Sequence, residues 1–493
     1  MPFGVCYDIV TGLSRASLWS FFRDVYVIGE ENIPVDQPAL FTHSNMIVDP
    51  AVIACTLPHG RKVHMWAKDS LFRNKILGGI IRNGGVVPVD RTTKNNQLLF
   101  RSTFEVLALG EMVCVFPEGT SSTLPSMLEF KDGISWAALE YIKYLKENTP
   151  QDITSSYQYK PAVIVPVCIT YPQKSKYRSV VIITYGKPIK IDSYVEDFFK
   201  DPRPTVKRLT ADVYAAVRRI GINAPNWDAW HAADISRQLL FSSPHAFDTH
   251  YLLVPPEDFI PLTQSLIDFF VEMAPNAPEV AELQKLLLRY RNILMQLRIR
   301  DDHLYKAQRT GLEAKRVSRQ TGLQALKSLA QFPLFAHALL VHLPVYILAK
   351  RAEQREIYEE VRAQDKIFTG LALLPLLYLV LGFIIWWWWW RPYALLGLAV
   401  ASLTVAAMAW HHVAALDDQY DAFTELVAGW KIFFAVMDKK EGGRAAKLEE
   451  AVRVRREGLE MLESCLEKYQ DRCTAAKAVL VYVRGEQELN GDE

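Results

Sequence analysis

The residues of this chain that could do chemistry are a histidine, two carboxylates and a glycine near the ends of two apolar segments. His43 and Asp49 lie in the stretch THSNMIVDP, and Glu118 and Gly119 lie in FPEGTS. A histidine is suited to remove a proton from a hydroxyl near pH 7, and a carboxylate that accepts its other N–H holds the productive tautomer. The pair predicts activation of an alcohol, as acyl transfer from a thioester to a hydroxyl requires.

The same residues also have purely structural interpretations. Asp49 ahead of Pro50 has the form of a helix N-cap, and His43 would then be an ordinary loop residue. Glu118 and Gly119 would form a tight turn after a core strand, which explains the glycine better than the glutamate. The chemical interpretation therefore needs support from the rest of the chain.

Four ordered motifs give that support. His43 and Asp49 come first, GVVPVDR at 85–91 second, FPEGTS at 116–121 third and the apolar VIVPV at 163–167 fourth. Together they resemble the glycerol-phosphate acyltransferase superfamily, which includes glycerol-3-phosphate, dihydroxyacetone-phosphate and lysophosphatidate acyltransferases. The resemblance covers roughly residues 20–220, and four motifs in order are far more specific than any one of them.

The resemblance implies a role for each matching residue. His43 is the general base toward the acceptor hydroxyl, Asp49 orients it, and the guanidinium of Arg91 grips the acceptor phosphate. The same acceptor site would be lined by Glu118, Gly119, Thr120 and Ser121. Lys68 in WAKD and Lys131 in FKDG are secondary candidates for phosphate or CoA contacts, although each lysine also fits a solvated surface position.

One spacing departs from the superfamily pattern. Its members usually read H-x4-D, whereas five residues separate His43 from Asp49 here. One extra residue turns a helix by about 100°, so a loop or bulge must absorb it. The fungal-type glycerol-3-phosphate acyltransferases have a similar H-x-N-x-x-V-D-P stretch, which Asn45, Val48 and Pro50 match. That branch favours glycerol 3-phosphate as the acceptor.

The expected mechanism is direct attack of the acceptor hydroxyl on the acyl-CoA thioester, with no covalent acyl-enzyme. No metal, nucleotide or flavin motif is evident, so acyl-CoA is expected as a co-substrate and no cofactor is expected. The motifs leave open lysophosphatidate or dihydroxyacetone phosphate as the acceptor. A catalytically silent membrane scaffold that keeps the fold is the alternative from another class.

Short apolar runs alternate with helical stretches over the motif region, which predicts an α/β acyltransferase domain over residues 25–225. The expected strands are 25–29, 39–42, 62–66, 86–89, 113–116, 162–170 and 180–185. The expected helices include 51–57, 95–109 and 135–146. An amphipathic N-terminal helix over residues 1–24 precedes this domain, and it either lies in a membrane interface or packs on the domain.

Residues 226–331 have helical periodicity and predict an accessory helical region. A membrane region is expected over 332–412, with a re-entrant or interfacial element at 332–348 and a transmembrane hairpin at 369–390 and 393–410. The run Trp386–Trp390 favours the headgroup level at the hairpin tip. Residues 413–493 are expected to form a cytosolic helical region that docks on the rest of the protein.

Lysines and arginines flank the hairpin on the side of its two outer ends, and only Arg391 lies at the tip. The positive-inside rule then gives both termini and the α/β domain a cytosolic location. The family resemblance adds the endoplasmic reticulum membrane as the expected location, with acyl-CoA, glycerol 3-phosphate and the bilayer as partners. The 493 residues carry 56 basic and 55 acidic side chains, which gives no attraction to nucleic acid. The six cysteines form no C-x-x-C pair and predict reduced thiols. The oligomeric state stays open.

Overall fold

The computed structural model describes residues 3–42, 48–89, 96–120, 122–148, 160–173, 176–242, 252–355, 359–438, 440 and 442–491. The chain forms two compact units. The first contains residues 1–222 and 353–367, and the second contains residues 223–352 and 368–493. Each unit is compact by itself.

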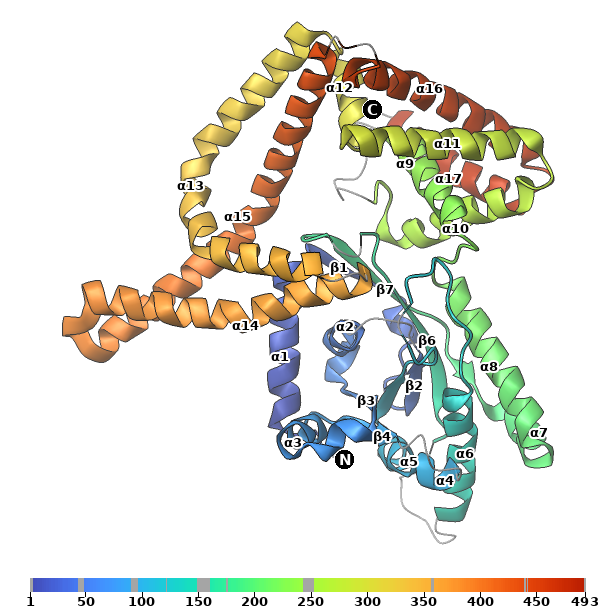
Figure 1. The fold of residues 1–493 in the computed structure, drawn as a ribbon. Helices are drawn as coiled ribbons and strands as arrows, with labels where there is room; N and C mark the ends of the chain where they lie inside the picture. The colour runs from blue at the N-terminus through green and yellow to red at the C-terminus, as the bar shows by residue number, and fades with distance from the viewer. Residues whose placement is uncertain are drawn as a thin grey trace. The chain divides into compact units, whose positions relative to one another are not determined.

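The first unit is built on a mixed, mostly parallel sheet, which confirms the predicted α/β fold (Figure 1). Its main strands lie in the order β1-β7-β6-β2-β5-β3-β4, and β8 pairs with β6. The pairings of β6 with β7 and with β8 are antiparallel, and the other described pairings are parallel. The strands are β1 (Asp24–Ile28), β2 (Ala39–Thr42), β3 (Val63–Lys68), β4 (Val87–Val89), β5 (Met112–Val115), β6 (Val163–Thr170), β7 (Val180–Tyr185) and β8 (Ile189–Lys190).

Both faces of this sheet are buried, because the strands are apolar at successive positions rather than at alternate ones. In β2, Leu40 belongs to one core cluster while Ala39 and Phe41 belong to the other. Helices α1 (Val5–Phe21) and α2 (Asp49–Thr56) cover the second face. The first face is covered by α5 (Arg101–Ala108), α6 (Gly133–Asn148), α7 (Asp192–Lys200) and α8 (Pro202–Arg219).

The strand order brings three sequence motifs to one edge of the sheet. Strand β2 pairs in parallel with β5 on one side and with β6 on the other, with Thr42 opposite both Val115 and Pro166. The carboxyl ends of parallel strands point the same way, so the segments that follow β2, β5 and β6 meet there. Ligands bind at this edge in open α/β sheets.

The seven strands expected from the sequence all occur, each within two residues of its expected ends. The expected helix 95–109 is divided into α4 (Asn96–Leu99) and α5, and α2 and α6 occur where helices were expected. The sequence analysis missed strand β8 and helix α3 (Lys75–Asn83). Helix α1 lies within residues 1–24, where the N-terminal helix was expected.

The second unit is helical (Figure 1). Its main helices before the apolar region are α9 (Trp227–Phe241), α10 (Pro256–Met273), α11 (Pro278–Leu297) and α12 (Asp301–Thr310). The tail contributes α16 (Arg444–Tyr469) and α17 (Thr474–Gly491), and α16 packs along α11. The apolar side chains Leu448, Leu462 and Leu466 of α16 are buried, so they belong to the surface that packs on the other helices of this unit.

The long apolar helices differ from the sequence expectation in their boundaries. Helix α13 (Ala314–Arg355) contains the segment 332–348, and it bends by 86° between Ala330 and Phe335, next to Pro333. Helix α14 (Glu359–Ile385) is followed by the tip at Trp386–Tyr393 and by α15 (Ala394–Met437). Helix α15 continues to Met437, so residue 412, where the membrane region was expected to end, lies inside a helix.

Within the described residues, the stretch Asp365–Met437 is long and apolar enough to cross a membrane. Its tip is held by local contacts: the indole N–H of Trp386 donates to the carbonyl of Ala394 at 3.1 Å, and the guanidinium of Arg391 lies over the ring of Trp387 at 4.7 Å. The indoles of Trp388 and Trp389 are exposed.

Candidate active site

Asp49 is a fully buried carboxylate at the carboxyl edge of the sheet. It is the first residue of α2, and Pro50 follows in the first turn, where a proline costs no hydrogen bond. The hydroxyl of Tyr171 donates to Oδ1 of Asp49 at 2.6 Å. Tyr171 directly follows β6, the neighbour of β2, so the strand order brings these two side chains together.

On the side of the sheet, the carboxylate of Asp49 is surrounded by buried side chains. Burial and the charge of Asp49 raise the pKa of Tyr171 well above its ordinary value, so its hydroxyl keeps the proton that it donates. The thiol of Cys114 in β5 is also fully buried, and burial together with the charge of Asp49 raises its pKa. Cys114 is therefore a neutral wall of the site rather than a nucleophile.

The segment after β5 forms a turn that fixes Glu118 and Gly119. The N–H of Gly119 donates to the carbonyl of Phe116 at 3.1 Å, and the N–H of Lys131 donates to the carbonyl of Pro117 at 2.9 Å. Gly119 has a φ of +69°, in the left-handed region that favours glycine. The side chain of Glu118 is buried, with 3% of its surface exposed. A turn requires the glycine but does not require a buried carboxylate, so the turn alone does not explain Glu118.

A pocket of about 260 Å³ opens beside this turn, at the ends of β3, β4 and β5. Its walls are mostly apolar and aromatic, and the rings of Trp66 and Phe100 stack at 5.4 Å between centroids. Lys68, Lys131 and Gly119 also line it. A β-carbon on Gly119 would lie 2.6 Å from Nζ of Lys131, so the ammonium group rests directly against the glycine. The pocket thus joins apolar walls to two cations.

Comparison with known proteins identifies this region. Residues 24–170, which include the strands and turns of the site, match the family model described as Acyltransferase. The chain carries an acyltransferase domain. This confirms the kind of domain that the four motifs predicted.

Two curated relatives and one solved structure are similar to parts of the chain. Glycerol-3-phosphate O-acyltransferase 2 of Saccharomyces cerevisiae is 25% identical over 301 residues, covering 58% of this chain and 37% of the yeast protein. The 1-acyl-sn-glycerol-3-phosphate acyltransferase of Bacillus subtilis is 31% identical over 101 residues, covering 20% of this chain and 49% of the bacterial protein. The crystal structure of the 1-acyl-sn-glycerophosphate acyltransferase of Thermotoga maritima has 21% identity and a TM-score of 0.31, covering 43% of this chain and 79% of that one. The chain therefore spans less than two-fifths of the yeast relative's length.

The acyltransferase domain brings together most of the predicted site residues that the structure describes. Asp49, Glu118 and Gly119 follow neighbouring strands at one edge, and Lys68 and Lys131 line the pocket. Thr120 is exposed next to the turn. Three predicted residues, His43, Arg91 and Ser121, lie outside the described residues, and their roles remain predictions.

Tyr171 is a residue of the candidate site that the sequence analysis missed. It lies four residues after the fourth motif, 122 positions from Asp49, and nothing in its local sequence indicates a partner. Trp66 and Phe100 were also missed as pocket walls. Their aromatic rings are the only local signal, and such rings are more often simple core residues.

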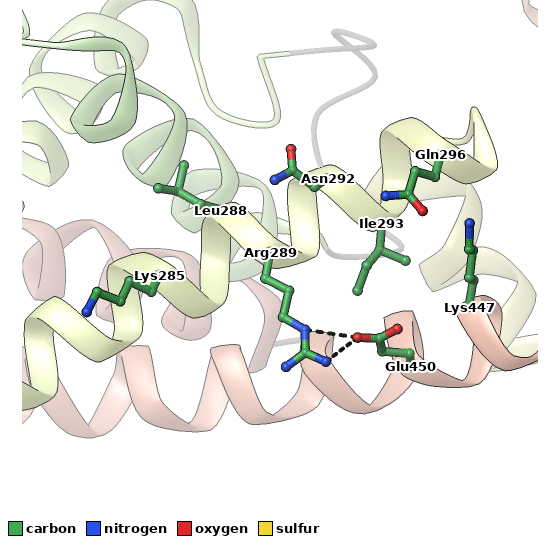
Figure 2. Close-up of a pocket in the computed structure, with 8 residues that line it drawn as sticks. All are labelled: Lys285, Leu288, Arg289, Asn292, Ile293, Gln296, Lys447 and Glu450. Carbon is green, nitrogen blue, oxygen red and sulfur yellow. Dashed lines mark hydrogen bonds and ion pairs between the residues drawn. The ribbon is translucent and has the colours of Figure 1, made fainter. Parts of the chain in front are cut away.

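A second hollow lies on the helical unit between α11 and α16, and Figure 2 shows its lining. It is an open groove of about 440 Å³, crossed by an ion pair in which Nε of Arg289 donates to Oε1 of Glu450 at 2.9 Å. Lys285 and Lys447 lie at its ends. Solvated charges of this kind are typical of a groove between two packed surface helices, and we assign no chemistry to it.

Proposed function

We propose that this protein is a membrane-bound acyl-CoA:sn-glycerol-3-phosphate 1-O-acyltransferase that makes lysophosphatidate. The observation that carries the proposal is the buried Asp49, held by Tyr171 at the carboxyl edge of the sheet. A pocket with Lys68 and Lys131 at its wall lies at the ends of β3, β4 and β5. His43 directly follows Thr42, the last residue of β2, in the sequence. The similarity to a yeast glycerol-3-phosphate O-acyltransferase supports the acceptor.

In this mechanism Asp49 accepts the N–H of one imidazole nitrogen of His43 and fixes the tautomer. The other nitrogen of His43 takes the proton of the acceptor hydroxyl as its oxygen attacks the thioester carbonyl carbon. The bond between that carbon and sulfur then breaks, and CoA leaves as a thiolate. The hydroxyl of Tyr171 contributes by holding Asp49 in one orientation. It also offsets the cost of burying the carboxylate.

The acceptor phosphate would be bound by cations at the same edge. The structure supports Lys131 and Lys68 for this role, because both line the pocket, and Arg91 follows β4 by two residues in the sequence. The N-terminus of α6 begins at Gly133, which also lines the pocket, and the N–H groups of a helix start favour an anion. Glu118 and Gly119 would then contact the glycerol part of the acceptor.

The apolar stretch Asp365–Met437 supports attachment to a bilayer as a hairpin with its tip at Trp386–Trp390. We propose that both termini and the acyltransferase domain lie in the cytosol and that the membrane is that of the endoplasmic reticulum. A membrane location suits the reaction, because the long acyl chain and the lipid product both partition into hydrocarbon.

Lysophosphatidate is the second candidate acceptor. The similarity to a bacterial 1-acyl-sn-glycerol-3-phosphate acyltransferase favours it over an unrelated alcohol. Dihydroxyacetone phosphate is also compatible with a site for a phosphorylated alcohol. A scaffold without activity has no chemical need for a buried Asp49 and a buried Glu118 beside a pocket with two lysines.

The test is acyl transfer from long-chain acyl-CoA by the full-length, detergent-solubilised protein, with the three acceptors offered in parallel. His43→Asn is the active-site variant, and His59→Asn, at an exposed histidine with a positive φ that asparagine tolerates, is the matched control. We expect lysophosphatidate from glycerol 3-phosphate with the wild type and the control, and none with His43→Asn. No transfer by folded wild-type protein to any acceptor would favour the scaffold.

A further inference from the structure

His64 is a fully buried histidine that lies outside the candidate active site. It is the second residue of β3, near the amino end of that strand. Its Nδ1 lies 2.5 Å from the carbonyl oxygen of Gly85, and its Nε2 lies 2.5 Å from Oε2 of Glu111, the residue directly before β5. A carbonyl oxygen only accepts, so Nδ1 donates to Gly85, and one further proton lies between Nε2 and the carboxyl group of Glu111.

The ring of His64 is also packed on one face. The ring of Phe3 stacks on it at 4.0 Å between centroids, with 29° between the planes. Gly85 has a φ of +75°, and a β-carbon on it would lie 2.6 Å from the ring of Phe3 and 3.2 Å from Nδ1 of His64. Only a glycine at position 85 therefore leaves room for this arrangement.

Strand β4 is the element that the contact with Gly85 fixes. Among the described strands it pairs only with β3, over three residues, and Pro88 at its centre has no N–H to donate. Trp66 lies opposite Val87 in this pairing, so Gly85 continues the same register opposite His64. The side chain of His64 thus adds a hydrogen bond two residues ahead of a short ladder.

The other end of β4 reaches the pocket of the candidate site. Val89, its last residue, lies opposite Lys68, the last residue of β3, and both residues line the pocket. Arg91, which is expected to bind the acceptor phosphate, follows Val89 by two residues in the sequence. A shift of β4 along β3 would therefore move a pocket wall and the point from which the chain continues to Arg91.

We propose that His64 is a positioning residue for the acceptor site. Its hydrogen bond to Gly85 holds β4 in register with β3, and β4 in turn places Val89 and the segment that leads to Arg91. This role rests on the proposed function, because it assumes that the acceptor phosphate binds at this end of the strands. His64 lies at the amino ends of the strands and acts only through Gly85 and β4.

Two substitutions of His64 separate its two hydrogen bonds. The amide nitrogen of an asparagine can take the position of Nδ1, and that of a glutamine can take the position of Nε2. His64→Asn therefore keeps a donor for Gly85, and His64→Gln keeps a donor for Glu111. Both variants lose the ring and its packing on Phe3, so each is the matched control for the other.

The first measurement is acyl transfer to glycerol 3-phosphate by the full-length, detergent-solubilised variants. We expect His64→Gln to raise the KM for glycerol 3-phosphate roughly tenfold, because one buried carbonyl loses its donor. Its kcat should change little, because His43 and Asp49 follow β2 rather than β4 in the sequence. His64→Asn should keep a KM close to that of the wild type.

The second measurement is hydrogen–deuterium exchange of β4, followed by mass spectrometry, which requires no turnover. The amides of β4 should exchange several-fold faster in His64→Gln than in the wild type and in His64→Asn. Unchanged exchange in β5 would show that the sheet remains folded in both variants.

Equal KM values for the two variants would overturn the proposal, because both lose the same packing. Exchange of β4 that is unchanged in His64→Gln would overturn it as well. Wild-type protein that transfers no acyl group to glycerol 3-phosphate would instead contradict the proposed function. The exchange of β4 would then still decide whether His64 anchors this strand.

Discussion

The hydroxyl of Tyr171 lies 2.6 Å from Oδ1 of Asp49, across 122 residues of sequence. Strand β2 lies between β6, which Tyr171 follows, and β5, which the turn of Glu118 follows. A hydroxyl that donates to a buried carboxylate holds it in one orientation. That is the arrangement which a residue that orients a histidine requires.

Tyr171→Phe removes this donor while keeping the ring. We expect kcat to fall about 10- to 100-fold, because a hydrogen bond to a charged group contributes about 1.5–3 kcal/mol. KM for the acceptor should change little, and the pH dependence of kcat should shift if Tyr171 acts through Asp49. Steady-state kinetics across pH is the measurement.

The matched control for that variant is Tyr185→Phe. Tyr185 belongs to the same core cluster, but its hydroxyl bonds Oγ1 of Thr56 at 2.8 Å. The Tyr185→Phe variant should lose some stability and keep the wild-type pH dependence of kcat. Equal effects of the two substitutions on kcat would show that Tyr171 contributes only packing.

Gly119→Ala should weaken acceptor binding. The new β-carbon would meet Nζ of Lys131 at 2.6 Å and would strain a backbone with a φ of +69°. We expect KM for glycerol 3-phosphate to rise roughly tenfold, equivalent to about 1.4 kcal/mol. Gly110→Ala is the control, because Gly110 has a φ of +78° and open space around it. If both variants raise KM equally, the contact with Lys131 has no part in binding.

Arg455→Met should destabilise the helical unit strongly. Asp301 is 1% exposed, and it accepts hydrogen bonds from Nε of Arg455 at 2.8 Å and Nη2 at 3.0 Å. Removal of the cation leaves a buried charge, which costs about 3–5 kcal/mol. Chemical denaturation followed by circular dichroism measures the free energy of unfolding.

The control for Arg455 is Arg289, whose ion pair with Glu450 joins the same two regions of the chain at the surface. Arg289→Met removes the pair with Glu450, in which the arginine is 59% exposed, and should cost at most about 1 kcal/mol. A loss from Arg455→Met no larger than this would contradict the buried ion pair as the main attachment of α16.

The stability of the helical unit should fall in mild acid because of His303. Burial lowers the pKa of His303 from its ordinary 6.5 to about 4, and the neighbouring Arg300 also disfavours the protonated ring. Between these two values the unfolded chain binds the extra proton, so the free energy of unfolding decreases as the pH falls from 6.5 to 4. The loss is at most about 3 kcal/mol. Thermal unfolding at pH 5 and pH 7 measures it, and His303→Gln should reduce the difference; an unchanged difference would assign it to other groups.

The sequence by itself determined the elements of the first unit and the class of its site. Strands such as Val163–Thr170 were predictable because β-branched residues at successive positions indicate a strand buried on both faces. Gly119 was predictable as a turn residue after an apolar strand. The class of enzyme followed from four motifs in order, since each motif alone has a structural explanation.

Only the tertiary structure decided which side chains meet. The contacts of Tyr171 with Asp49 and of Arg455 with Asp301 join residues more than 100 positions apart. The end of α15 at Met437 could not be predicted from the sequence either. A helix that is stabilised by packing continues through polar residues, whereas a boundary drawn from composition ends where the polar residues begin. Local patterns record whether a residue is buried, whereas the order of strands and the packing of helices determine what it is buried against.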